Sequence, residues 1–317
     1  MDEGWIDVHH HAYHPRLVAE LAAGGIRSMA PGVPVPQWRA ADSLAVMDRW
    51  GIGGAVLSVL LPDAVLHHGH GLVRRANEWT AQLVGDHPGR FCALACLPLP
   101  DVGATLATID HAFDDLGMNG VVVGTPLPGG RLLADPEFVP VLTELNRRHA
   151  VVFIHPNPGV GCVCAANGGA AIPPPLVDFV VSTTRGVLDL VYRGSVQRHP
   201  HIRFLLAHAG GMLPYLLERL ELAQVWVAGG NPNATADSVR RTLARFYYEV
   251  AQSAWPGALE CLGAVTDQDH ILFGSDFPFM PDSVVGRTRA AVIAQPGLCT
   301  EQVARAGALT LFPGFAS

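Results

Sequence analysis

The segment Ile6-Asp7-Val8-His9-His10-His11 decides between the two fold classes that the sequence leaves open. It is the first of eight short apolar runs that alternate with helix-like segments, and it ends in three histidines. Such alternation predicts parallel strands joined by helical crossovers. An open doubly wound sheet would usually carry a glycine-rich phosphate loop where this chain has the histidines. Eight strand–helix units in 317 residues therefore predict an α/β fold of the (β/α)8 TIM-barrel class.

The predicted elements cover nearly the whole chain. We expect strands at residues 5–9, 54–60, 91–97, 120–124, 151–155, 203–208, 246–250 and 270–275. We expect helices at residues 43–50, 72–85, 102–116, 136–149, 176–199, 214–227, 254–262, 283–294 and 301–311. No charge run, low-complexity linker or internal repeat separates them, so residues 1–317 are expected to form a single domain.

Composition excludes several classes of protein. A hydrophobic content of 49% and a net charge of only −7 exclude a disordered chain, and no apolar stretch approaches the roughly 18 residues of a membrane span. All 21 basic residues are arginines, which excludes catalysis by a Schiff-base lysine or a phosphate-loop lysine. The acidic balance argues against nucleic acid, no secretory signal is visible, and the six cysteines fit a reducing compartment. We expect a cytoplasmic protein whose partner is a small molecule.

Four predicted strands deliver polar side chains to one end of the barrel. The carboxyl ends of the strands form the active-site face of a parallel barrel. Because residues two apart on a strand point to the same side, His9 and His11 are expected to project together while His10 points away. The other polar residues that directly follow apolar runs are His155, His208 and Asp276. Three imidazole nitrogens and a carboxylate oxygen suit a divalent metal ion, and His208 is expected to be a further ligand or a general acid or base.

Taken together, the motifs at the strand ends are recognisable. They are Asp7-x-His9-x-His11, His155-Pro156, His208-Ala209-Gly210-Gly211 and Gly274-Ser275-Asp276-Phe277-Pro278, with weaker signatures at Pro36-Gln37-Trp38, Glu144-Leu145-Asn146, Thr183-Thr184-Arg185 and Phe246-Tyr247-Tyr248-Glu249. This set resembles the amidohydrolase superfamily over nearly the whole chain. More narrowly, it is similar to the branch that contains aminocarboxymuconate-semialdehyde decarboxylase and 6-methylsalicylate decarboxylase.

The resemblance implies a site with one Zn2+ or Mn2+ ion. The implied ligands are His9, His11, His155 and Asp276, with His208 as the catalytic histidine. Relatives bind a substrate carboxylate with an arginine on the helix after the sixth strand, sometimes from the neighbouring subunit, and Arg219 matches that position. The resemblance also implies a homodimer or a higher homo-oligomer. Binuclear hydrolases of the superfamily use a carboxylated lysine, which this chain lacks, and a second substrate-binding arginine has no clear match.

We expect a metal-dependent, non-oxidative decarboxylase that releases CO2 from an aromatic or otherwise unsaturated carboxylic acid of the hydroxybenzoate, 6-methylsalicylate or muconate-semialdehyde type. His208 or Asp276 would deliver a proton to the carbon that bears the carboxylate. Candidate walls for a flat substrate are Trp38, Phe277 and Phe279. The alternative function is hydrolysis of a lactone, amide or ester at the same mononuclear site. A third interpretation is a catalytically silent barrel that binds a ligand.

Several further features allow two interpretations each. Asp7 could reach the site or have a buried structural role, and Asn157 and Ser58 stand at strand ends where they could bind substrate. The stretch His67-His68-Gly69-His70 could line the pocket or form an exposed loop. Residues 157–175 form a long segment rich in small residues, which predicts a lid or a dimer contact.

Overall fold

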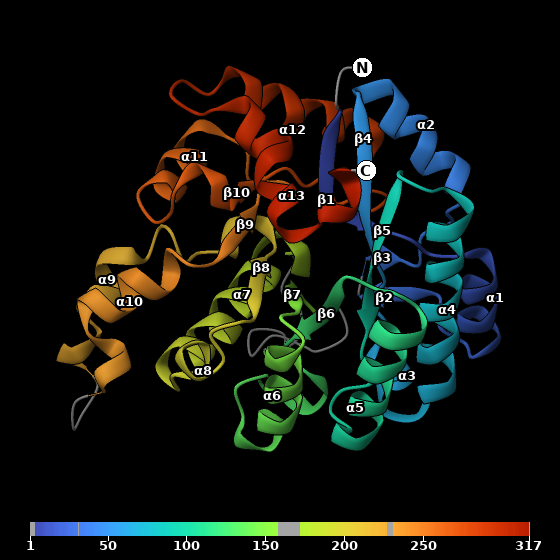
Figure 1. Cartoon of the computed structure of the whole chain (residues 1–317), viewed down its shortest axis with the longest axis horizontal. Helices are drawn as coiled ribbons and strands as arrows, with labels where there is room; N and C mark the ends of the chain where they lie inside the picture. The colour runs from blue at the N-terminus through green and yellow to red at the C-terminus, as the bar shows by residue number, and fades with distance from the viewer. Residues whose placement is uncertain (1–3, 31, 158–171, 227–230, 317) are drawn as a thin grey trace.

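The structure is a computed structural model that describes residues 4–30, 32–157, 172–226 and 231–316. Eight parallel strands form one sheet in the order β1-β4-β5-β6-β7-β8-β9-β10 (Figure 1). They are β1 (Trp5–His11), β4 (Ile52–Ser58), β5 (Phe91–Cys96), β6 (Gly120–Thr125), β7 (Val151–Pro156), β8 (Arg203–Leu206), β9 (Tyr247–Glu249) and β10 (Ile271–Leu272). Two further strands, β2 (Ser28–Ala30) and β3 (Val33–Pro34), pair as an antiparallel hairpin outside this sheet.

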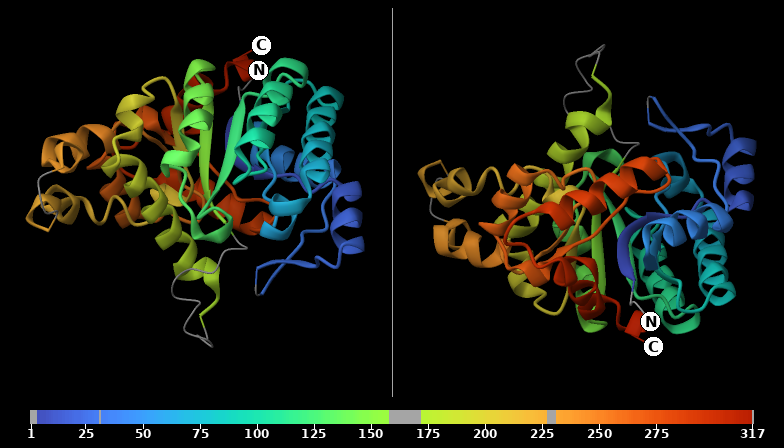
Figure 2. Two further views of the ribbon diagram at one scale, coloured as in Figure 1. Left: turned by 90° about the horizontal axis from the view of Figure 1, so that it is seen from below. Right: turned by 90° about the horizontal axis from the view of Figure 1, so that it is seen from above.

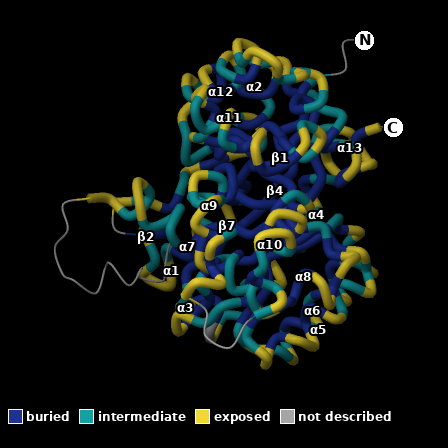
Figure 3. The backbone as a smooth tube through the Cα atoms, turned by 90° about the vertical axis from the view of Figure 1, so that its left-hand side faces the viewer, coloured by how far each residue is buried: buried dark blue, intermediate teal, exposed yellow. Residues whose placement is uncertain are grey.

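The helices surround the strands (Figure 2). They are α1 (Pro15–Ala23), α2 (Ala40–Trp50), α3 (Asp63–His68), α4 (His70–Asp86), α5 (Val102–Asp110), α6 (Val139–Arg147), α7 (Pro174–Tyr192), α8 (Ser195–Arg198), α9 (Leu217–Glu221), α10 (Ala236–Leu243), α11 (Pro256–Gly263), α12 (Asp282–Ala294) and α13 (Gly307–Leu311). Burial follows this arrangement, since the strands form the buried centre of the molecule and the helices expose their outer faces (Figure 3). No helix in the described part of the chain is both long and apolar enough to cross a membrane.

Side-chain spacing explains why each helix packs on the sheet. In α4 the buried residues include Val73, Ala76 and Leu83, which recur at intervals close to the helical repeat. This spacing places them on one face of the helix, and that face packs against β5. All residues of β5 are buried, because the strand lies between the helices outside and the side chains that fill the barrel.

The predicted barrel is confirmed, and each predicted strand overlaps an observed one. The structure differs most at the last strand, where only β10 (Ile271–Leu272) forms a regular ladder with β9. Backbone N–H and C=O groups of residues 273–277, which follow β10, form hydrogen bonds with β1 instead. Helices α1, α3 and α10 and the β2–β3 hairpin were not predicted. Helix α1 buries Leu17 and Leu21 one turn apart, but this apolar pattern spans only nine residues.

The barrel closes where the chain after β10 meets β1. Val8 N donates to Phe273 O (3.0 Å), and His11 N donates to Phe277 O (2.7 Å). Between these bonds, Asp276 N donates to His9 O (2.9 Å). The first and last strand segments are therefore neighbours, and residues on them that are far apart in sequence share one end of the barrel.

The buried carboxylate of Asp7 fastens this closure. Its Oδ1 accepts hydrogen bonds from His9 N (3.1 Å) and Ser275 N (3.0 Å). Its Oδ2 accepts from Ser275 Oγ (2.5 Å) and lies 2.8 Å from His10 Nδ1, whose other ring nitrogen meets Ser43 Oγ at 2.7 Å. Of the two roles open for Asp7, the structure supports the structural one. His10 points away from His9 and His11, as predicted.

We expect Asp7→Ala to lower the free energy of unfolding by about 3 kcal/mol or more, because it leaves several buried donors without an acceptor. Urea denaturation measures the change. The control is Asp48→Ala, which removes a carboxylate that is 67% exposed and paired with Arg90; it should cost no more than about 1 kcal/mol. Equal effects of the two substitutions would show that Asp7 does not fasten the barrel.

Candidate active site

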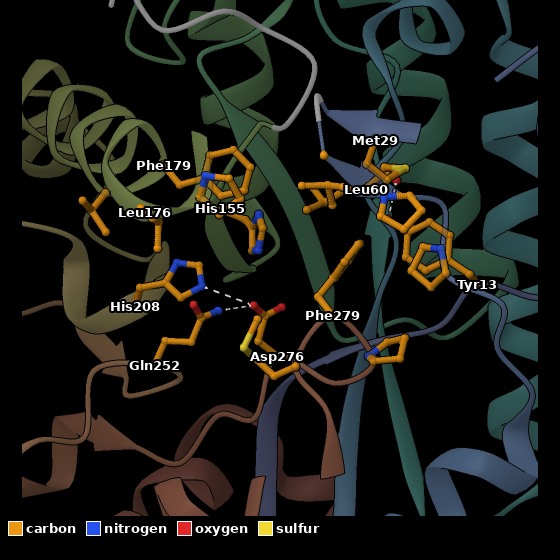
Figure 4. A pocket seen from close by; sticks show the side chains of 18 of the residues that line it. Tyr13, Met29, Leu60, His155, Leu176, Phe179, His208, Gln252, Asp276 and Phe279 are labelled. Carbon is orange, nitrogen blue, oxygen red and sulfur yellow. Dashed lines mark hydrogen bonds and ion pairs between the residues drawn. The ribbon is translucent and has the colours of Figure 1, made fainter. Parts of the chain in front are cut away.

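A cavity of about 520 Å3 opens at the carboxyl ends of the strands (Figure 4). Its walls come from the barrel rim, the start of α7 and the β2–β3 hairpin. On one side lie the titratable and amide side chains of His155, His208, Gln252 and Asp276. Most of the remaining lining is apolar, so the polar chemistry of the cavity is confined to one side.

Four polar atoms meet at this side of the cavity. His9 Nε2 lies 3.0 Å from His11 Nε2 and 3.1 Å from His155 Nε2. Asp276 Oδ1 lies 3.3 Å from His9 Nε2 and 3.1 Å from His11 Nε2. All four residues are buried. The barrel closure explains the meeting, because it brings β1 next to the segment that carries Asp276.

The second nitrogen of each imidazole is held by a different neighbour. His9 Nδ1 donates to Glu249 Oε1 (2.8 Å), and His155 Nδ1 donates to the carbonyl oxygen of Pro156 (2.7 Å). His11 Nδ1 lies 3.1 Å from Ser58 Oγ. Protons on the Nδ1 atoms leave the Nε2 lone pairs directed at one another, an arrangement that is repulsive without a cation between them.

The geometry of this cluster fits a metal ion. Atoms about 2.1 Å from one ion are roughly 3.0 to 3.4 Å apart when the angles between them are about 90° to 110°. The four distances above fall in that range. Asp276 Oδ1 accepts no hydrogen bond from the described residues although it is buried. His208 also lies close, since one ligand atom each of His9, His155, His208 and Asp276 fall within 4.8 Å of one another.

The pKa shifts also suit a metal site. Burial lowers the pKa of His11 and holds that of His155 well below its ordinary value, so both rings are neutral. Burial raises the pKa of Asp276, but the charge of His9 and the close approach of the neighbouring imidazoles outweigh it and leave this pKa well below its ordinary value. Burial lowers the pKa of His9, but Glu249 and Asp276 overcome this and raise it to about 10. The negative charges of Glu249 and Asp276 that stabilise a proton on His9 would also stabilise a metal cation beside it.

His208 lies beside the cluster rather than within its closest group. Its Nε2 is 3.6 Å from Asp276 Oδ2, and neither ring nitrogen has a hydrogen-bond partner among the described residues. The residue begins a short 3-10 turn after β8 and has a positive φ of 53°. The next turn residues are Gly210 and Gly211, where a Cβ would collide with Tyr248 and with the Val180 carbonyl oxygen. The histidine–glycine motif therefore serves to turn this ring into the cavity.

Glu249 connects the two parts of the site. It is fully buried at the end of β9, and its Oε1 accepts hydrogen bonds from His9 Nδ1 and from His208 N (2.5 Å). Its Oε2 accepts from Ala251 N (2.7 Å). A side chain at Gly274 would overlap Glu249 Oε2, so this glycine makes room for the carboxylate. In the sequence, Glu249 stands out only as the last residue of the signature Phe246-Tyr247-Tyr248-Glu249, and no role was predicted for it.

Gln252 was not predicted at all. Its Nε2 donates to Asp276 Oδ2 (2.5 Å), the carboxylate oxygen that faces His208. Gln252 and Asp276 have positive φ values of 56° and 59°, as His208 does, so three cavity residues have left-handed backbone conformations. A glutamine in a loop just after a strand gives no sequence signal, because its position depends on this unusual backbone.

Of the three aromatic residues expected to contact the substrate, Phe279 lines the cavity and Trp38 and Phe277 do not. Trp38 is buried and donates from Nε1 to Ser43 Oγ (2.8 Å), so it supports the framework around His10. Phe277 packs against the His10 ring, with 5.2 Å between ring centroids. Neither residue lines the cavity, whereas Phe279 does. Asp276, Pro278, Phe279 and Met280 of this segment line the cavity, and Phe277 turns away from it towards His10.

Arg219 is exposed on α9, with its guanidinium carbon 5.9 Å from the centre of the Trp226 ring. It does not line the cavity of its own chain. A role across a subunit contact therefore remains a prediction.

The weaker candidates are also placed. Ser58 holds His11, and Asn157 donates to Asp63 Oδ1 (3.0 Å) outside the main cavity. His68 and His70 belong to the end of α3 and the start of α4, separated by Gly69, so this stretch is a helix junction and not a long loop. Most of the predicted lid or dimer contact, residues 158–171, lies outside the described residues.

Curated relatives align over almost the full chain. A 6-methylsalicylic acid decarboxylase of Aspergillus aculeatus is 33% identical, with 97% of this chain and 96% of the relative covered. A decarboxylase of Aspergillus niger is 32% identical over 98% of this chain and 88% of its own length.

Solved structures show the same fold. A crystal structure of an amidohydrolase II superposes with a TM-score of 0.85 at 26% identity and covers 98% of this chain and 99% of that chain. The 2,6-dihydroxybenzoate decarboxylase complexed with 2,6-dihydroxybenzoate gives a TM-score of 0.80 at 21% identity, with the same coverage.

The family model described as amidohydrolase matches residues 6–306, which include every residue of the histidine–aspartate cluster. The barrel, the cluster and this match agree, and the chain belongs to the amidohydrolase family.

Proposed function

We propose that this protein is a metal-dependent, non-oxidative decarboxylase of an aromatic carboxylic acid. The observation that carries the proposal is the cluster of three imidazole nitrogens and one carboxylate oxygen at the wall of a mainly apolar cavity. Relatives that are about one-third identical over nearly the full chain are decarboxylases, one of them of 6-methylsalicylic acid. An apolar cavity with one polar side suits a flat acid held by its carboxylate.

The metal ligands would be His9, His11, His155 and Asp276. Each of them has an Nε2 or Oδ1 atom that lies 3.0 to 3.3 Å from such an atom of at least one other member. A divalent cation held there, Zn2+ or Mn2+, would supply Lewis acidity towards the oxygen atoms of the substrate. A related dihydroxybenzoic acid decarboxylase structure contains manganese. Glu249 and Ser58 hold the His9 and His11 rings in the orientation that directs Nε2 towards the ion.

His208 and Asp276 are the pair that moves the proton. His208 Nε2 and Asp276 Oδ2 are 3.6 Å apart and both residues line the cavity, so a proton can be held between them and the substrate. Transfer of that proton forms a C–H bond at the ring carbon that bears the carboxylate. The carbon–carboxylate bond then breaks, its electron pair returns to the ring, and CO2 leaves. No redox cofactor is needed, because the transferred proton replaces the lost carboxylate.

Two further proposals concern the oligomeric state of the protein and the compartment in which it acts. We propose a homodimer or higher homo-oligomer, in which Arg219 serves the site of a neighbouring subunit. Exposed Tyr215, Val225 and Trp226 lie near Arg219 in sequence, and aromatic residues and arginine are typical of interface centres. We also propose that the protein acts in the cytoplasm, which is consistent with the free thiols of the described cysteines.

Release of CO2 tests the function. Protein loaded with Zn2+ or Mn2+ should release CO2 from at least one acid among 2-hydroxybenzoates, 6-alkylsalicylates and muconate-semialdehyde acids. His208→Ala should lower kcat/KM by about 100-fold or more with its metal content unchanged, because it removes one member of the proton pair. The control His201→Ala, at an exposed position, should retain activity. No release by metal-loaded protein, together with turnover of a lactone, amide or ester, would establish the hydrolase instead.

Glu249→Gln should weaken metal binding by about 10-fold to 100-fold, because it removes the charge that orients His9 while keeping the size of the side chain. Competition with a chromogenic chelator measures the affinity. Glu260→Gln, the same change at an exposed position on α11, is the control. Unchanged affinity in the Glu249 variant would mean that this carboxylate does not support the metal site.

Light scattering combined with activity tests the assembly. We expect an oligomer, and Arg219→Ala should raise KM for the acid if the guanidinium binds the carboxylate across the contact. A fully active monomer would remove this role of Arg219.

A further inference from the structure

We propose that the cavity selects aromatic monocarboxylates that carry an extended apolar substituent and rejects acids that carry a second charged group. This inference rests on the proposed decarboxylase function and specifies its substrate class. It follows from what lines the cavity away from the metal-binding cluster, and from the space that a simple hydroxybenzoate would leave there.

The described lining of the cavity contains no guanidinium or ammonium group that could pair with a second negative charge. None of the described residues that line the cavity is an arginine, and the sequence contains no lysine. The segments outside the described residues cannot add one, since residues 1–3, 31, 158–171, 227–230 and 317 include neither type. A second carboxylate would therefore lose its hydration without gaining a partner from this chain, which is costly in an apolar environment.

The volume of the cavity exceeds what a simple aromatic acid needs. A hydroxybenzoic acid has only about ten non-hydrogen atoms, whereas pockets of about 300 to 1,000 Å3 enclose drug-sized ligands. The cavity of about 520 Å3 therefore has room beyond the ring. That room lies across from the polar side, where Tyr13, Met29 and Leu60 face His208 and Asp276 over the cavity (Figure 4).

The walls of the extra space are apolar. Tyr13 adds no free hydroxyl, because its OH donates to the Leu60 carbonyl oxygen (3.0 Å). From α7 the cavity receives Leu176 and Phe179, and Leu176 is 69% exposed although it is a large apolar side chain. An exposed apolar side chain at a cavity wall gains by covering an apolar ligand. The substituent would thus extend between α7 and the hairpin.

A series of 6-alkylsalicylates tests the inference on metal-loaded protein. We expect kcat/KM for CO2 release to rise about threefold with each added methylene from methyl to pentyl, because each one is transferred from water to an apolar wall. A matched pair isolates the charge: 6-(3-methylbutyl)salicylate and 6-(2-carboxyethyl)salicylate have similar shapes and differ in one carboxylate. The charged member should be turned over at least about 100-fold less efficiently.

A variant pair locates the effect. Leu176→Asp should flatten the dependence of kcat/KM on chain length, since it puts a charge on the proposed wall. Ile293→Asp introduces the same charge at an apolar side chain on α12 that is 49% exposed and lies outside the cavity, and it should leave the dependence unchanged.

The outcomes separate this inference from the proposed function. Release of CO2 from plain salicylates with no dependence on chain length would overturn the inference and leave the decarboxylase intact. Equal turnover of the charged and uncharged members would also overturn it, and would mean that a partner subunit contributes a cation. Absence of CO2 from every acid would overturn the proposed function itself.

Discussion

The backbone hydrogen bond from Asp276 N to His9 O is the contact on which the site depends. It joins the two ends of the barrel, so a histidine on the first strand and an aspartate after the last strand become neighbours. Two further bonds, from Val8 N and His11 N, join β1 to the segment after β10. The carboxylate of Asp7 bonds to both segments and strengthens the same closure. The side chains of His9 and Asp276, which are more than 260 residues apart in sequence, can therefore lie 3.3 Å from each other only in a closed barrel.

A second constraint acts through one buried carboxylate. Glu249 holds the imidazole of His9 and the backbone of His208, so the positions of a proposed metal ligand and of the proposed proton-transfer residue are set by the same group. This arrangement needs an acidic residue at the end of β9 and a residue without a side chain beside it, just after β10. Gly274 meets the second requirement. The site is thus built from packing inside the barrel as much as from the residues that face the cavity.

The parts of the structure that could be predicted from sequence are those with a local pattern. The apolar runs indicated the strands, and a polar residue directly after a run placed His155, His208 and Asp276 at one rim. Glu249 also ends a strand, but its role depends on contacts with residues of two other strands. Gln252 depends on a left-handed backbone that no local pattern reveals. Trp38 and Phe277 do not line the cavity, and their orientation could not be predicted because an aromatic residue near a motif does not indicate which way its side chain turns.

The left-handed backbone at His208, Gln252 and Asp276 has a consequence for how this enzyme can change. Each such residue costs of the order of 1 kcal/mol or more relative to glycine, and the surrounding barrel has to compensate for it. Glycine at these positions would relieve the strain and remove the functional group in the same step. Selection for stability alone would therefore favour glycine at these positions and produce a barrel without activity. Lineages that keep the activity must retain stabilising contacts elsewhere.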